Sequence, residues 1–399
     1  MADTVIRDLP QLIEAEFGEK LRAIRSHLHR NPEIAWKEVD TTAFIRRELT
    51  DMGLEPMDLG IGSGTAALLQ GGHPGKLLVL RADIDALPVE EGTGAEDASQ
   101  RPGMMHACGH DIHVTGLLGA AMALCRVKEE LHGDILFLFQ PAEESASGAE
   151  KLIHSGFFDT WKPDGFLGLH VWPLLPFGKI GLREGPVLSA KDSFHITIRG
   201  RGGHGSSPHL AVDPIPAACA LVGSMQTVVS RNVPALEPVV VSVCSIPGGA
   251  VGNDNVIPND CSMVGSIRSF DPQVRQTVLD RITALVHSTA AAYGCEADLQ
   301  LASNAPAVVN HPTMYRIMET STRAIFGDEG FVIPDPVAIS EDFALYGAVA
   351  PSCLALFGVG EPGQPPQALH HPAFYPQSHV LPHAAAFLAD SAIRFLNEE

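Results

Sequence analysis

The chain has 399 residues, more than one ordinary compact core accommodates, so we expect two domains. Hydrophobic residues make up 45% and charged residues 19%, a globular composition that excludes an intrinsically disordered chain. The formal net charge of −20 argues against nucleic acid and against an anionic membrane surface as partners.

Targeting signals are not evident in the sequence. The first residues contain neither the basic segment nor the apolar segment of a signal peptide, and no stretch reaches the roughly 18 uninterrupted apolar residues of a spanning helix. The seven cysteines are odd in number and not clustered, so we expect a reducing, cytoplasmic setting without a disulfide framework. Six of them lie in apolar surroundings and are assigned to packing: Cys125, Cys219, Cys244, Cys261, Cys295 and Cys353.

The first part of the chain predicts an α/β pattern. The expected elements are helices at about 9–31 and 38–52, strands at 64–69 and 76–81, a buried helix at 113–128, and buried strands at 133–140 and 165–169. Several of these strands are apolar on both faces, as in sheets that are covered by helices on each side.

Reactive side chains follow three of these strands. They are Asp83 and Asp85 after the strand at 76–81, Glu143 and Glu144 after the strand at 133–140, and His170 after the strand at 165–169. Open α/β sheets place their ligand crevice at the carboxyl ends of strands. We therefore expect these side chains to meet at one edge of the sheet.

Cys108 and His110 form a Cys-x-His unit directly before the apolar helix. Thiolate and imidazole are preferred ligands of zinc and its first-row neighbours, and an i, i+2 spacing in extended backbone points both side chains the same way. On this segment alone, a small buried cysteine with an incidental neighbour is the more common explanation. The metal interpretation depends on the rest of the chain.

The pattern changes after about residue 186. Strand 193–199, helix 213–230, strands 238–246 and 261–270, helix 271–293 and strand 296–303 follow in turn. This order is typical of a ferredoxin-like α+β domain. We expect a catalytic metal-binding domain at 1–185 and 303–399, interrupted by an inserted lid and dimerisation domain at 186–302.

The α/β pattern resumes after the insertion. A helix at 312–326, a loop at Ser340-Glu-Asp-Phe343, a short strand at 353–357 and a terminal helix at 381–396 complete the chain. The predicted fold is an open mixed sheet with helices on both faces plus the inserted domain.

Five candidate ligands are more than one tetrahedral zinc needs: Cys108, His110, Glu144, His170 and one histidine of the His370-His371 pair. They suit two metals about 3.5–4 Å apart. Thiolate and imidazole argue against calcium and magnesium, whereas zinc, manganese, cobalt and nickel stay open. Glu143 is a spare carboxylate that could deprotonate a water molecule, although Glu143 and Glu144 alone could be a solvated pair.

Several strings resemble those of the dinuclear metallo-amidohydrolases. They are Arg81-Ala-Asp-Ile-Asp-Ala-Leu-Pro88, Met105-His-Ala-Cys-Gly-His-Asp111, Gln140-Pro-Ala-Glu-Glu144, Gly202-Gly-His204 and Leu369-His370. That family includes hippurate hydrolases, N-acyl-amino-acid amidohydrolases and auxin-conjugate hydrolases, within the wider aminoacylase and carboxypeptidase group. The likeness extends in order and spacing from about residue 20 to the end.

The resemblance implies a role for each matching residue. Two divalent metals are bound by Cys108, His110, Glu144, His170 and His370, with His371 as the alternative to His370. Glu143 is the general base and then the general acid. Asp83 and Asp85 orient the ligands from behind. Cys108 occupies a position that an aspartate fills elsewhere in the wider group.

The resemblance also assigns residues of the inserted domain. His204 matches a histidine that, in relatives, reaches the partner's active site and stabilises the oxyanion. Asn255 and Arg268 match positions that hold a substrate carboxylate, although Arg268 could instead be a surface salt-bridge residue. A homodimer through the inserted domain is expected, and a tetramer stays open.

The expected activity is hydrolysis of the amide bond of N-acyl amino acids, hippurate-like or aminoacylase-like, through a metal-activated water. A small-peptide carboxypeptidase or a deacylase of a specialised conjugate such as an acyl-diaminopimelate is the alternative enzyme. A non-catalytic metal or amino-acid binding protein is the alternative of another class. The spare carboxylate of Glu143 argues against it, because a pure binding site does not need one.

Overall fold

The structure is a computed structural model that describes residues 8–361 and 363–398. The chain forms two compact units. Unit 1 contains the chain up to Val187, Val308–Asp335 and the chain from Glu341 onward, and unit 2 contains Leu188–Ala307 and Pro336–Ser340. Each unit has its own hydrophobic core.

Unit 1 is built on an eight-stranded mixed sheet. In spatial order its strands are β1 (Pro56–Asp58), β2 (Thr65–Leu69), β4 (His132–Gln140), β3 (His73–Asp83), β5 (Gly165–Pro176), β16 (Ser352–Gly360), β6 (Ile180–Gly181) and β15 (Phe331–Val332). The central strands β4, β3, β5 and β16 are parallel to their neighbours in this group, so their carboxyl ends lie at one edge. The predicted strands lie within this set.

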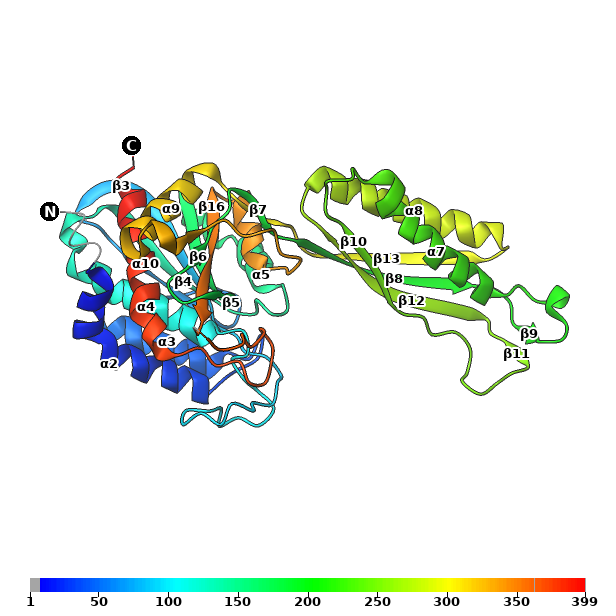
Figure 1. Cartoon of the computed structure of the whole chain (residues 1–399), viewed down its shortest axis with the longest axis horizontal. Helices are drawn as coiled ribbons and strands as arrows, with labels where there is room; N and C mark the ends of the chain where they lie inside the picture. The colour runs from blue at the N-terminus through cyan, green and yellow to red at the C-terminus, as the bar shows by residue number, and fades with distance from the viewer. Residues whose placement is uncertain (1–7, 362, 399) are drawn as a thin grey trace. The chain divides into compact units, whose positions relative to one another are not determined.

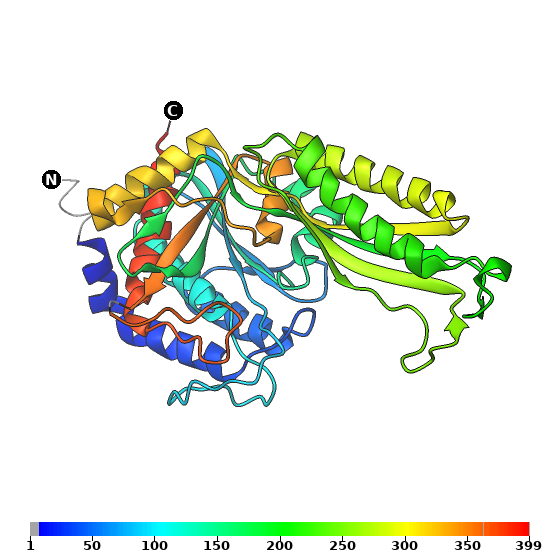
Figure 2. The same cartoon turned by 45° about the vertical axis from the view of Figure 1, so that its right-hand side comes forward.

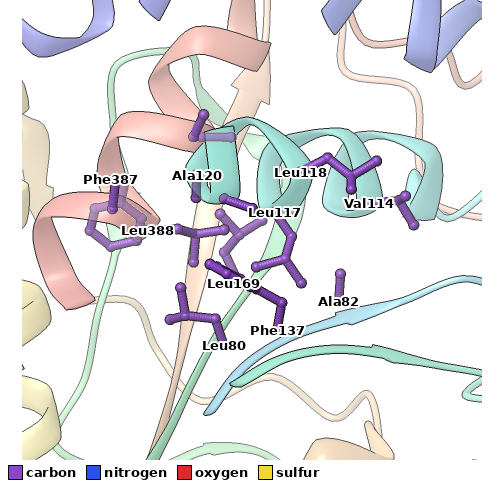
Figure 3. Close-up of a cluster of buried hydrophobic side chains, with 14 of the residues drawn as sticks. Leu80, Ala82, Val114, Leu117, Leu118, Ala120, Phe137, Leu169, Phe387 and Leu388 are labelled. Carbon is purple, nitrogen blue, oxygen red and sulfur yellow. The ribbon is translucent and has the colours of Figure 1, made fainter. Parts of the chain in front are cut away.

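Helices pack on one face of this sheet. They are α2 (Leu9–Arg30), α4 (His110–Arg126), α9 (Pro312–Phe326) and α10 (Leu381–Leu396), with α3 (Val39–Asp51) against β1 and β2. Figure 2 shows the blue N-terminal helices beside the red C-terminal helix, in agreement with the contacts between α2 and α10. Figure 3 shows the core that results, where Leu117 of α4 and Leu388 of α10 pack with Leu80 and Leu169 of the sheet.

The opposite face of the sheet carries shorter elements. These are α5 (Gly148–His154), α6 (Phe157–Thr160) and the 3₁₀ helix η4 (Asp342–Ala348). Phe343 of η4 lies so close to Gly168 of β5 that a methyl group there would be 3.0 Å from its ring. Because side chains alternate across a strand, Arg81 and Gly168 face this layer while Leu80 and Leu169 face the helical core.

Helix α4 begins earlier than the sequence suggests. His110 is its first residue, and Gly109 before it has a φ of 82°. A β-carbon at Gly109 would also lie 2.5 Å from the side chain of Val171, so glycine suits both the turn and the close approach. The expectation of an extended Cys-x-His segment was therefore wrong, because Cys108 lies in the turn and His110 in the helix.

Unit 2 is a four-stranded antiparallel sheet with two helices on one face (Figure 1). The elements are β8 (Ala190–Arg199), α7 (Pro214–Asn232), β10 (Val240–Ser245), β12 (Asp260–Ser269), α8 (Pro272–Ala292) and β13 (Glu296–Ala305). The strand order β10-β12-β8-β13 is that of a ferredoxin-like domain. The predicted fold class, an open mixed sheet covered on both faces plus this inserted domain, is confirmed.

Local sequence explains why these helices begin where they do. Asp213 and Asp271 each cap a helix by accepting backbone N–H groups, and each is followed by a proline in the first turn. Both features are favoured at helix N-termini. A small two-stranded sheet joins β9 (Gly203–His204) to β11 (Val256–Ile257), and another joins β7 (Gly185–Leu188) to β14 (Val308–Asn310).

Cysteines and membrane segments were also predicted from the sequence. All seven cysteines are free thiols. Cys219 and Cys244 are exposed, which corrects their assignment to packing: each projects from the solvent side of its element. Across residues 8–361 and 363–398, none of the helices is both long and apolar enough to cross a membrane.

Candidate metal centre

The candidate ligands of unit 1 come from neighbouring elements. Asp83 is the last residue of β3, whereas His170 lies inside β5, because that strand continues to Pro176 rather than ending at residue 169 as predicted. Glu143 and Glu144 follow β4 closely, and α4, which begins at His110, packs on β3 and β5. The parallel strands thus bring these side chains to one region of the sheet.

One group of potential ligands consists of Cys108, His110 and His170. Their ligand atoms lie within 4.8 Å of one another, and all three residues are buried. The Cys108 Sγ is 3.5 Å from the His170 Nε2. One sulfur and two nitrogens at this spacing are a donor set that suits zinc and its first-row neighbours.

Backbone carbonyl groups orient both imidazoles of this group. The His110 Nδ1 is 2.8 Å from the carbonyl oxygen of Asp85, and the His170 Nδ1 is 2.8 Å from that of Val171. A carbonyl oxygen only accepts, so each Nδ1 carries the proton and donates it. Each Nε2 therefore keeps its lone pair for a metal ion, an arrangement typical of metal-binding histidines.

A second group consists of Cys108, Glu144 and His370, again within 4.8 Å of one another. The His370 Nε2 is 3.4 Å from the Glu144 Oε1. The backbone N–H of His370 donates to the carbonyl of Ala107 at 2.8 Å, which attaches this loop to the turn that carries Cys108. Cys108 thus belongs to both groups, as a sulfur shared by two metals would.

The backbone of His370 is in the left-handed region, with a φ of 65°. Such a conformation is unfavourable for a non-glycine residue and concentrates at functional sites. The neighbouring His371 is exposed, and its Nδ1 accepts the backbone N–H of Ala373 at 3.0 Å. Of the two histidines that the sequence left open, His370 is the one brought to Glu144.

Glu143 lies beside the ligands. Its Oε2 is 4.0 Å from the His110 Nε2. Asp85 fixes the loop, because its two carboxylate oxygens accept the backbone N–H groups of Glu143 at 3.1 Å and Glu144 at 3.0 Å. Burial raises the pKa of Glu143 well above its usual range, and the nearby charges of Glu341 and Glu144 raise it further. The carboxyl group is thus held in a setting that favours proton uptake.

The buried polar atoms fit a bound cation. Within the described residues, the His110 Nε2 and the Glu144 Oε1 are buried and have no hydrogen-bond partner. Burial lowers the pKa of His170 to about 3, which keeps its imidazole neutral, as a metal ligand must be. Burial would also lower the pKa of His110, but the carboxylates of Asp83 and Asp85 raise it to about 10. A cation would replace the proton that these carboxylates attract.

Sequence reasoning missed a second buried layer around Arg81. The guanidinium donates to Gln140 at 2.9 Å, to Asp83 at 2.9 Å, and to Glu341 and Asp342 at 3.0 Å each. Gln140 in turn donates to Asp342 and accepts from the hydroxyl of Tyr346. The run Ser340-Glu-Asp-Phe343 is predicted only as a loop, and an arginine at the end of an apolar strand was the available sign that a buried cation needs acidic partners.

The remaining predicted residues lie in unit 2. His204 is exposed on β9 and pairs with Val256 of β11, while Asn255 lies directly before β11 and accepts the backbone N–H of Gly205 at 2.8 Å. Ser206 donates its backbone N–H to the His204 Nδ1 at 3.1 Å, so the His204 Nε2 carries the proton and is a free donor. Arg268 is half-buried on β12, opposite Val240, and burial lowers its pKa.

Comparisons with known proteins agree with this architecture. The family model described as Peptidase family M20/M25/M40 matches residues 79–394. The N-acetyl-L-cysteine deacetylase of Bacillus subtilis is 38% identical over 96% of this chain and 90% of its own length. The IAA-amino acid hydrolase ILR1-like 5 of Arabidopsis thaliana is 35% identical over 96% of this chain and 88% of its own length.

A solved structure extends the likeness to three dimensions. It is a Bacillus subtilis protein described as a dinuclear metal binding peptidase from the M20 family. The two chains are 34% identical, with a TM-score of 0.82 over 95% of this chain and 98% of the other. The chain therefore belongs to peptidase family M20/M25/M40 and is a metal-dependent amidohydrolase.

Proposed function

We propose that this protein hydrolyses the amide bond of N-acyl amino acids, hippurate-like or aminoacylase-like, and releases a carboxylic acid and a free amino acid. The observation that carries the proposal is the pair of ligand groups that share Cys108, with the carboxylate of Glu143 beside them. The names of both relatives support it, because one describes removal of an acetyl group from an amino acid and the other hydrolysis of an amino-acid conjugate.

The candidate ligands would hold two divalent ions. Cys108, His110 and His170 form one site, and Cys108, Glu144 and His370 form the other. Ions bound there would activate a water molecule and polarise the acyl carbonyl. Zinc, manganese, cobalt and nickel all suit this combination of sulfur, nitrogen and oxygen donors.

Glu143 performs the proton transfers. Its carboxylate takes a proton from the water whose oxygen bonds to the acyl carbon, and it then gives that proton to the leaving nitrogen as the C–N bond breaks. Water is consumed and the acid and the amine are formed, so atoms and charge balance. Asp85 keeps Glu143 in place through the loop backbone.

Residues of unit 2 complete the reaction. The free Nε2–H of His204 donates a hydrogen bond to the acyl oxygen as negative charge develops there. Asn255 and Arg268 bind the carboxylate of the substrate, and the planar guanidinium suits that task. Unit 2 acts as a lid and as the dimerisation domain of a cytoplasmic homodimer, in which His204 serves the active site of the partner.

The substrate class is tested with metal-stripped protein that is reloaded with manganese or zinc. Release of amino acid from N-acetyl, N-benzoyl and longer N-acyl amino acids should occur only after reloading. Release from dipeptides alone would favour a small-peptide carboxypeptidase, which the peptidase description of the solved relative also supports. Release from an acyl-diaminopimelate alone would favour the specialised deacylase, and saturable binding without any product would favour a binding protein.

The trans-acting role of His204 has its own test. Protein with His204→Ala and protein with Glu143→Gln should each be inactive, and mixing them after subunit exchange should restore a fraction of the activity. A mixture as inactive as its components would refute the role of His204 across a dimer.

A further inference from the structure

Two buried carboxylates hold the loop that carries Glu143. The backbone N–H groups of three successive residues, Ala142, Glu143 and Glu144, each donate to one of their oxygens. Asp85 accepts from Glu143 and Glu144, and the Oε1 of Glu38 accepts from Ala142 at 2.9 Å. Glu38 is fully buried. It therefore fixes the residue directly before the proposed general base.

Glu38 lies at the start of α3 but does not serve that helix. It occupies the N-cap position, yet its side chain makes no capping hydrogen bond. Glu33 caps the helix instead, because its Oε2 accepts the backbone N–H of Thr41 at 2.8 Å. The second oxygen of Glu38 accepts the hydroxyl of Ser63 at 2.9 Å. Capping of α3 therefore does not explain why this carboxylate is buried.

The segment between α2 and α3 is fixed to the strand end that carries Asp85. The backbone N–H of Ala86 donates to the carbonyl of Glu33 at 2.8 Å, and Ile34 pairs with Ala86 in an isolated parallel bridge. Glu38 and Asp85 thus belong to one connected backbone frame. A loop whose N–H groups are bound by both carboxylates is held by residues that are themselves held in place.

Trp36 fixes the other end of the loop. Its indole N–H donates to the Ser147 Oγ at 3.0 Å. The Ser147 Oγ is 2.6 Å from the Ser145 Oγ, and Ser145 donates its own proton to the carbonyl of Ala142 at 3.1 Å. Ser147 is therefore the donor between the two hydroxyls. This series of hydrogen bonds ends at Ala142, the residue whose N–H is bound by Glu38.

Unfavourable backbone conformations occur in the same place. In the part of the chain that the structure describes, four non-glycine residues have a positive φ: Trp36 at 65°, Ala142 at 59°, Ala146 at 51° and His370 at 65°. For a side chain as large as tryptophan this is a true outlier, and such conformations persist only where the surroundings impose them. Three of the four belong to the loop or to its contact residue Trp36. The loop is therefore held in a shape that it would not adopt by itself.

We propose that Glu38 is a positioning residue for the proton transfers, and that with Trp36 it fixes residues 141–147 so that the carboxyl group of Glu143 stays beside the metal centre. The inference rests on the proposed function and adds residues that act through the loop backbone. A displacement of about 1 Å can cost a reaction about 10²-fold in rate, so a precise loop conformation has a direct effect on turnover.

Glu38→Ala is the direct test, with the N-acyl amino acid that the substrate panel identifies. The change leaves the N–H of Ala142 without its acceptor, so kcat should fall by about 10- to 100-fold while KM and metal content stay unchanged. Glu38→Gln should keep most of the wild-type kcat, because its amide oxygen still accepts from Ala142 and the hydroxyl of Ser63 can turn to accept from its NH₂ group.

Glu33→Ala is the matched control. Glu33 is another buried carboxylate of the same segment, but it caps α3 and pairs with Arg101 rather than with the loop. This change should lower the unfolding midpoint and leave kcat unchanged. Trp36→Phe is a milder variant, which keeps an aromatic ring but loses the hydrogen bond to Ser147. It should lower kcat by about fivefold without a change in KM.

Hydrogen–deuterium exchange gives a measurement that needs no substrate. In metal-loaded protein, peptides that cover residues 141–147 should exchange faster in Glu38→Ala than in wild-type protein, and at the wild-type rate in Glu33→Ala. Circular dichroism shows whether each variant is folded. If Glu38→Ala does not fold, Trp36→Phe decides, because unchanged kcat together with unchanged exchange in that variant would refute the proposal.

Three other results would overturn the proposal. They are wild-type kcat in Glu38→Ala, a loss of bound metal that accounts for its lower kcat, and a Glu38→Gln variant as slow as Glu38→Ala, which would assign the effect to charge. Wild-type protein that hydrolyses no substrate of the panel would instead reject the proposed function. The exchange measurement would still show whether Glu38 holds the loop, so the two failures are distinguishable.

Discussion

The two units carry their candidate residues in opposite ways. In unit 1, Cys108, His110 and His170 are buried and backbone carbonyl groups fix the two imidazoles, whereas a further candidate, His370, is 51% exposed. In unit 2, His204 and Asn255 are exposed beside a short two-stranded sheet with few fixed partners. Ligands of an ion need a fixed position, whereas groups that meet a substrate must be reachable. Substitutions of the buried ligands of unit 1 should therefore affect metal binding, whereas substitutions in unit 2 should affect turnover or substrate binding without loss of metal.

Glu143→Gln should produce the largest loss of turnover. Removing the group that accepts the proton should lower kcat by about 10²- to 10⁴-fold. Metal content, measured by elemental analysis, should stay at the wild-type value, because the two groups that share Cys108 hold the ions without Glu143. A variant with both ions and more than a few per cent of wild-type activity would refute the general-base role.

Arg81→Gln should produce the largest loss of stability. The change leaves Asp83, Glu341 and Asp342 without their common cation, so the free energy of unfolding in urea should fall by about 3–5 kcal/mol. Arg323→Gln is the matched control, because Arg323 pairs with Glu319 and Asp328 at the surface and should leave the free energy of unfolding nearly unchanged. Equal effects of the two variants would mean that the buried layer does not stabilise unit 1 in this way.

His204→Ala should separate the two units most clearly. Loss of one oxyanion donor should lower kcat by about 10²- to 10³-fold, while metal content and the unfolding midpoint stay unchanged. His209→Ala, a change of another exposed histidine of unit 2, is the control and should retain full activity. A loss of bound metal in His204→Ala would contradict the division between the units.

Asn255→Ala should have the smallest effect. Loss of one hydrogen bond to a substrate carboxylate should weaken substrate binding by about tenfold. The change should therefore raise KM and leave kcat nearly constant, as steady-state kinetics with the substrate identified from the panel will show. A fall in kcat without a change in KM would assign Asn255 to the chemical step instead.

Much of unit 1 could be predicted because its strands are continuous apolar runs with acidic residues at or just after their ends, as at Asp83 and Glu143. The ferredoxin-like order of unit 2 could also be predicted, from its strands and from the helices between them. The conformation of Cys108 and His110 could not be predicted in this way. A helix that starts at His110 requires Gly109 to adopt a left-handed backbone conformation and to lie close to the side chain of Val171. A period-2 spacing alone does not distinguish this turn from a strand.

Glu341 shows the other limit of the sequence. Its partner Arg81 is 260 residues away along the chain, and although Arg81 ends an apolar strand, nothing local marks Glu341 as buried. Only the packing of η4 on the sheet brings them together. Pairing over such a separation is a property of the topology, so a pattern of neighbouring residues cannot reveal it.

The carbonyl groups of Asp85 and Val171 have a thermodynamic consequence. Because main-chain atoms of the sheet and its adjoining loop set the direction of both imidazoles, the metal-free protein already holds them in the binding orientation. Ion uptake should then require no ordering of the chain and expose or bury little apolar surface. We expect a heat-capacity change of ion binding near zero when calorimetry is repeated over a range of temperatures, and a large negative value would reveal a site that folds around its ions.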